Sequence, residues 1–98
     1  MGKVFIKVVS WLARTFGAKS DSLTLEVNLE QRLTLKDLLQ QLAEEHEQFG
    51  KMAFDNGQRF CGGILVVLNN RLIDVPHSWN VRLKDGDKVI LLPPVYGG

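Results

Sequence analysis

Residues 22 to 29 alternate between polar and apolar side chains, and this feature constrains the fold more than any other. The apolar set is Leu23, Leu25, Val27 and Leu29, and the polar set is Ser22, Thr24, Glu26 and Asn28. A period of two over this length predicts a strand that buries one face. The sequence therefore requires a sheet whose second face stays polar at this strand.

The residues before this strand predict its hairpin partner. Residues 4–12 are rich in β-branched and aromatic side chains, which favour a strand. Gly17 to Asp21 then predicts the turn between the two strands. Alternation along the first strand places Phe5, Val9 and Trp11 on the outward face.

A helix is predicted after the hairpin, because the apolar spacing changes at Thr34. Asp37 follows Thr34 by three residues, which is typical of a capping box, and Leu33 and Leu38 occupy the positions of a hydrophobic staple. The apolar stripe of this helix is Leu35, Leu38, Leu39, Leu42 and Ala43. We expect the helix to end near Phe49, with Gly50 as its stop.

The second half of the chain predicts three further strands after an irregular stretch. These strands are residues 64–68, 71–73 and 88–92, and the stretch before them is 51–63. The continuous apolar run at 64–68 predicts a central strand that is buried on both faces. Turns are expected at Asn69-Asn70 and at Asp85-Gly86-Asp87, and Pro93 ends the last strand.

The order hairpin, helix, strands predicts an α+β fold with one main helix on one face of a mixed four- to five-stranded sheet. This is the layout of a β-grasp domain, in which the first and last strands are parallel central neighbours. The length of 98 residues suits one domain over 1–98. Residues 93–98 form an extended tail in this interpretation.

Composition excludes several classes of protein. The net charge of +1 gives no sign of nucleic acid or of a membrane surface as a partner. Lys7 interrupts the first apolar segment, so a signal peptide is not expected. The single Cys61 fits a reducing compartment, and we expect a cytoplasmic protein in which Cys61 is a small buried residue. His46 and His77 are far apart in sequence, so no metal site is expected.

The last six residues predict an arm that leaves the body of the protein. Pro93-Pro94 holds extended backbone, so the arm spans roughly 15–20 Å. It ends in a free carboxylate on Gly97-Gly98, two residues without side chains that can enter a narrow channel. The alternative interpretation is an incidental, frayed end.

Four segments in order resemble a known family. They are Ile6-Lys7-Val8, Val67-Leu68-Asn69-Asn70, Leu83-Lys84-Asp85-Gly86-Asp87-Lys88-Val89 and Leu92-Pro93-Pro94-Val95-Tyr96-Gly97-Gly98. The chain thereby resembles the MoaD/ThiS family of ubiquitin-like sulfur carriers. It is most similar to the small subunit of molybdopterin synthase, the MoaD group.

The resemblance implies a chemistry for the tail. An E1-like adenylyltransferase of the MoeB/ThiF type adenylates Gly98 with ATP, and a sulfur donor such as a cysteine desulfurase or rhodanese converts it to a thiocarboxylate. The large subunit of molybdopterin synthase, of the MoaE type, then receives the sulfur for the molybdenum cofactor. The carrier binds no cofactor and is not catalytic alone, because ATP belongs to the activating enzyme.

The resemblance also implies the site. Gly97 and Gly98 carry the chemistry, and the partner-binding residues are Trp11, Leu72, Leu92, Pro93, Pro94, Val95 and Tyr96. The alternative for Trp11 is a core position, or cover by the long loop. Alternatives for the function are a carrier for thiamine, cysteine or tRNA thiolation, a ubiquitin-like protein modifier, and a non-covalent interaction module.

Overall fold

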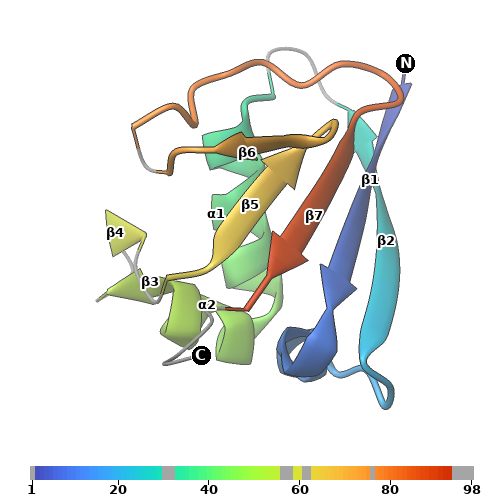
Figure 1. Cartoon of the computed structure of the whole chain (residues 1–98), viewed down its shortest axis with the longest axis vertical. Coiled ribbons are helices and arrows are strands. Elements are labelled where there is room, and N and C mark those ends of the chain that lie inside the picture. Colours follow the sequence, from blue (N-terminus) through green and yellow to red (C-terminus); the bar gives the residue numbers. More distant parts are fainter. Residues whose placement is uncertain (1, 30–32, 56–58, 61–62, 76, 94–98) are drawn as a thin grey trace.

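The computed structural model describes residues 2–29, 33–55, 59–60, 63–75 and 77–93. Its elements are β1 (Gly2–Val9), the 3-10 helix η1 (Ser10–Phe16), β2 (Ser22–Leu29), α1 (Leu35–Glu45), α2 (Glu47–Ala53), β3 (Phe54–Asp55), β4 (Arg59–Phe60), β5 (Leu65–Leu68), β6 (Arg71–Ile73) and β7 (Lys88–Leu92). The order in the main sheet is β2-β1-β7-β5-β6, and β3 and β4 form a second, two-stranded sheet (Figure 1).

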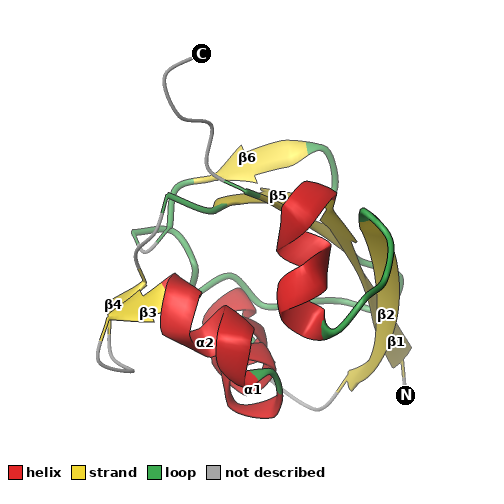
Figure 2. Cartoon of the chain, turned by 90° about the horizontal axis from the view of Figure 1, so that it is seen from below, coloured by secondary structure: helices red, strands yellow, loops and turns green. Residues whose placement is uncertain are grey.

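The sheet has the predicted mixed topology. β1 pairs antiparallel with β2 and parallel with β7, so the first and last strands are central neighbours, as expected. The helices all lie on one side of this sheet (Figure 2). The core between these two layers is made of fully buried side chains, among them Val4, Ile6, Val8, Leu35, Leu38, Leu39, Val89 and Leu91. The fold is therefore the β-grasp fold.

The start of α1 confirms the predicted capping box. The backbone N–H of Asp37 donates to Thr34 Oγ1 at 3.1 Å, and the N–H of Thr34 donates to Asp37 Oδ2 at 3.2 Å. Such a cap contributes about 1 kcal/mol to stability. Leu33 and Leu38 are both buried beside it, in the positions expected for the staple.

The predicted strand over residues 4–12 is wrong at its end. β1 stops at Val9, and Ser10 takes a left-handed φ of 61°, which turns the chain out of the sheet into η1. Leu12, Ala13 and Phe16 are buried at helical spacing. Gly17 ends η1 with a φ of 86°, so the hairpin connection is longer than the predicted turn from Gly17 to Asp21.

The predicted helix end at Gly50 is also wrong. α1 ends at Glu45, and α2 begins after His46, which has an extended backbone with φ −126° and ψ 92°. Gly50 lies inside α2, where an added Cβ would be 2.5 Å from the carbonyl oxygen of Ala43. The glycine therefore permits a close approach of α2 to α1 rather than a helix stop.

The irregular stretch before β5 contains a small aromatic cluster. Phe54 on β3 and Phe60 on β4 lie 5.4 Å apart between ring centroids, and Trp79 lies 5.9 Å from Phe60. Sequence patterns did not predict β3 or β4. Cys61, expected to be a buried residue, lies outside the described residues.

Two turns at one end of the sheet are joined by side chains. Asn69 and Asn70 have left-handed φ values of 48° and 69°, as in the tight turns of β-hairpins. Asn69 Nδ2 donates to Asp87 Oδ1 at 2.9 Å, and the N–H of Lys84 donates to Asp87 Oδ2 at 2.7 Å. The predicted turns at 69–70 and 85–87 are thus confirmed and are fixed to each other.

Among the residues that the structure describes, no helix combines the length and the hydropathy that a bilayer crossing requires.

Candidate functional site

The root of the tail lies at the end of a central strand. β7 ends at Leu92, and Pro93 follows as a half-buried residue. The other predicted tail residues, Pro94, Val95, Tyr96, Gly97 and Gly98, lie outside the described residues. Among the described residues, the site is therefore the surface around Leu92 and Pro93.

That surface is the outer face of the sheet, opposite the helices. The strand register places Leu65 beside Leu92, and it places Val67 beside Ile90 on one side and Leu72 on the other. Four of these residues alternate with buried neighbours along β5 and β7, and Leu72 on β6 is paired with the outward-facing Val67, so all five point outward. They form a continuous apolar area, here called the outer patch, made of Leu65, Val67, Leu72, Ile90 and Leu92.

The outer patch is open at its β6 side. Leu72 is 65% exposed and Leu65 is 39% exposed, whereas Leu92 is half-buried. Exposed apolar areas of this kind mark sites of interaction. The structure thus brings the predicted residues Leu72 and Leu92 onto one face.

Trp11 is exposed, as expected, but it is not on a strand. It lies on η1 and is 43% exposed, because Leu12, Ala13 and Phe16 turn toward the core instead. η1 follows β1 at the end of the sheet where β7 also ends (Figure 1). Trp11 therefore belongs to an element at the end of the sheet where β7 ends.

The predicted burial of residues 64–68 on both faces is wrong, and Leu65 was missed for this reason. Val66 and Leu68 are buried, but Leu65 and Val67 face outward. A continuous apolar run conceals the alternation that would have revealed these two residues. One signal in the sequence indicated an apolar outward face. The neighbouring strand, Lys88-Val89-Ile90-Leu91-Leu92, also has apolar residues on both of its faces.

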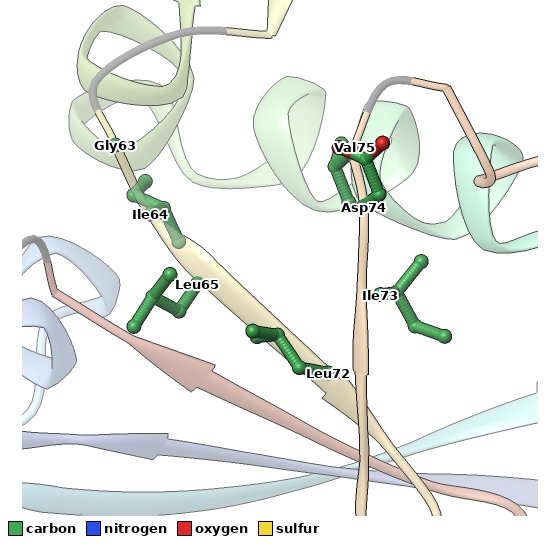
Figure 3. A pocket seen from close by; sticks show the side chains of 7 residues that line it. All are labelled: Gly63, Ile64, Leu65, Leu72, Ile73, Asp74 and Val75. Carbon is green, nitrogen blue, oxygen red and sulfur yellow. The ribbon is translucent and has the colours of Figure 1, made fainter.

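A hollow of about 360 Å³ borders the outer patch where the β5–β6 hairpin opens. Pairing between the two strands ends at Val66 and Ile73, and the chain diverges beyond them (Figure 3). The residues around the hollow are Gly63, Ile64, Leu65, Leu72, Ile73, Asp74 and Val75. Asp74 is the one charged residue among them.

A model of the ThiS family matches residues 6–98, which include the tail. The chain belongs to the ThiS family of ubiquitin-like sulfur carriers. The family expected from the four sequence segments is thus confirmed. No curated protein matches the sequence significantly.

Solved structures share the ThiS-family fold over the whole chain. SAMP1 from Haloferax volcanii is 25% identical with a TM-score of 0.79, and the match covers 99% of this chain and 100% of that one. Urm1 from Trypanosoma brucei is 26% identical with a TM-score of 0.72, covering 99% and 96%.

A third similar structure is a complex. One chain of the complex between subunits 1 and 2 of the molybdopterin-converting factor from Helicobacter pylori is 28% identical, with a TM-score of 0.56. The match covers 98% of this chain and 99% of that one. A protein of similar length and fold is thus seen bound to a second protein.

Proposed function

We propose that this ThiS-family protein carries sulfur on the carboxyl group of Gly98. The observation that carries this proposal is the family match, which extends through Gly97-Gly98. The position of Pro93 supports it, because β7 ends there beside an exposed apolar surface. A tail that departs from such a surface reaches the active site of the protein that binds the surface.

The proposed chemistry starts from a poor electrophile, since a carboxylate repels nucleophiles. An E1-like enzyme therefore joins AMP to the Gly98 carboxylate, and pyrophosphate leaves ATP. A sulfur nucleophile at the level of sulfide then attacks the carbonyl carbon, and AMP leaves with the electrons of the broken C–O bond. The chain contributes access and position, because a tip without side chains lets the groups of the enzyme approach the carbonyl.

For the acceptor of the sulfur, we propose the large subunit of a molybdopterin synthase. The support is the similarity to a chain of the Helicobacter pylori complex, in which subunits 1 and 2 are bound together. In this assignment the outer patch contacts the large subunit while the tail enters it. Carriers for thiamine, cysteine or tRNA thiolation use the same first steps and differ only in the acceptor.

A second candidate function is protein modification. SAMP1 is by name a small archaeal modifier protein, and its fold matches this chain with a TM-score of 0.79. In that case the activated Gly98 carboxyl is transferred to lysine amines of target proteins. The two functions share the adenylated intermediate and differ in the nucleophile that consumes it.

The mass of the intact protein separates these functions. After incubation with an E1-like enzyme, ATP and a sulfur donor, we expect a gain that equals the replacement of one oxygen atom by sulfur. A reaction without ATP is the control and leaves the mass unchanged. A ladder of larger conjugates instead supports the modifier. If neither product forms and no adenylate is trapped, the carrier proposal is wrong.

The outer patch makes a separate prediction about docking. We expect Leu72→Asp to weaken binding of the activating enzyme at least roughly tenfold, because it places a charge where an apolar residue is desolvated in the complex. Stability changes little, since Leu72 is 65% exposed. Binding is measured by titration calorimetry.

The matched control for Leu72→Asp is Val81→Asp. Val81 is 40% exposed, and its carbonyl oxygen accepts a hydrogen bond from Leu35 at the start of α1, on the helix side of the sheet. Equal losses of affinity in the two variants would show that the outer patch is not the docking surface.

A further inference from the structure

The free edge of β2 carries an inference that is independent of the tail. β2 is the outermost strand in the order β2-β1-β7-β5-β6 and has eight residues (Figure 1). Native proteins protect such edges with proline, with several charged residues or by keeping the strand short. β2 has no proline and only one charged residue, Glu26, whereas the opposite edge strand β6 has three residues and includes Arg71.

The backbone hydrogen bonds show which groups of β2 point away from the sheet. The N–H of Phe5 donates to the carbonyl of Asp87, and the carbonyl of Lys3 accepts from the N–H of Gly86. The backbone groups of the odd-numbered residues of β1 therefore point toward β7. The backbone groups of the even-numbered residues of β1 therefore point toward β2. The register places Leu23, Leu25 and Val27 opposite these even-numbered residues. Because hydrogen-bonding direction alternates along a strand, the backbone groups of the polar residues of β2 point to the open edge. These residues are Ser22, Thr24, Glu26 and Asn28.

We propose that β2 pairs with β2 of a second copy of this chain. In the antiparallel register centred on Leu25, Leu25 lies opposite its own copy and Leu23 lies opposite Val27. Thr24 then lies opposite Glu26, and the outward N–H and C=O groups of these two residues meet. The half-buried apolar side chains of β2 cover each other on the helix side of the joined sheet.

Electrostatic interactions favour this register over the register centred on Glu26. Centring the pair on Glu26 would place two like charges directly opposite each other, which is destabilising. In the register centred on Leu25, Glu26 lies next to Thr24 of the second copy. Lys7 of the second copy lies on the other side of that Thr24. Lys7 is exposed and has no ion pair among residues 2–29, 33–55, 59–60, 63–75 and 77–93. Glu26 of each copy is thus placed between its own Lys3, at 3.4 Å, and Lys7 of the second copy.

The interface is small, so the dimer is weak. Joining two edge strands buries less than the roughly 1,200 Å² of a standard interface, and complexes of this class are transient. We expect a dissociation constant of roughly 10 µM to 1 mM, measured by sedimentation velocity over a series of concentrations. Dimerisation leaves the outer patch free, because that patch lies on β5, β6 and β7.

Charge reversal provides the test. Glu26→Lys and Lys7→Glu each turn two attractions into repulsions in the symmetric dimer, which raises the dissociation constant roughly tenfold. The double variant Lys7→Glu with Glu26→Lys restores the attraction and the dimer. Glu44→Lys is the matched control, because it makes the same charge change on an exposed position of α1.

A second variant tests the backbone pairing itself. Thr24→Pro removes an N–H that points to the open edge and not to β1, so the monomer keeps its ladder while the dimer is lost. In hydrogen exchange of the native chain, the amides of Thr24 and Glu26 become more protected as concentration rises, while those of Leu25 and Val27 do not change.

Three results would overturn the proposal. The chain could remain monomeric up to about 1 mM, the limit of the weak range expected for so small an interface. Glu26→Lys and Glu44→Lys could have the same dissociation constant. The amides protected by dimerisation could lie outside β2.

Discussion

Gly98→Val is expected to lose AMP transfer by at least about a hundredfold, because small errors in the position of a reacting group have effects of that size. The branched side chain would stand directly beside the carboxyl carbon and obstruct the approach of ATP. The fold should be unaffected, since the last strand, β7, ends at Leu92. Release of pyrophosphate from ATP by an E1-like enzyme measures the step.

A control variant must separate the effect of a side chain at Gly98 from a general effect of an added valine. Asn80→Val places the same side chain at an exposed turn in the part of the chain that the structure describes. It should transfer AMP at the native rate, and both variants should melt close to the native temperature. Normal AMP transfer to Gly98→Val would contradict the steric argument for Gly97-Gly98, even if sulfur transfer were later observed.

Gly50→Ala is expected to destabilise the protein by about 1–3 kcal/mol, which is the usual cost of overpacking. An added Cβ would lie 2.5 Å from the carbonyl oxygen of Ala43, and this atom belongs to the backbone of α1 and cannot rotate away. Helix propensity alone predicts the opposite sign, a gain of about 0.5–1 kcal/mol. The sign of the change therefore decides between close packing and propensity.

Denaturant unfolding measures this change in the free energy of unfolding. Gln48→Ala is the control, because it adds an alanine at an exposed position of the same helix and should leave stability nearly unchanged. A Gly50→Ala variant as stable as Gln48→Ala, or more stable than the native chain, would show that α2 does not need the close contact with Ala43.

The parts of the fold that could be predicted are those in which local pattern and tertiary packing agree. The alternation of β2 and the cap formed by Thr34 and Asp37 were visible in sequence because each depends on a few neighbouring residues. The boundary at Ser10 was not, because apolar residues resume directly after it with Trp11, Leu12 and Ala13. Only the left-handed φ of Ser10 separates the strand from η1.

Gly50 and Leu65 show two other limits of sequence patterns. A glycine near the end of an apolar stripe predicts a helix stop, but here it serves a contact between two helices that only the tertiary structure reveals. Leu65 belongs to a run with no polar residue, so nothing local distinguishes its outward side from the buried side of Val66. For the site, the tail chemistry stays a prediction from the family resemblance. Leu72 and Leu92 were predicted from sequence, whereas Leu65 and Val67 were identified only from the strand register.

The placement of β7 determines how the protein bears a mechanical load. A force applied to Leu92 along the axis of β7 acts on both strands that flank β7. This strand is bonded to β1 on one side and to β5 on the other, and its hydrogen bonds run across the direction of pulling. Both ladders must therefore shear together before β7 can slide, so the fold resists a force that is applied through its last strand.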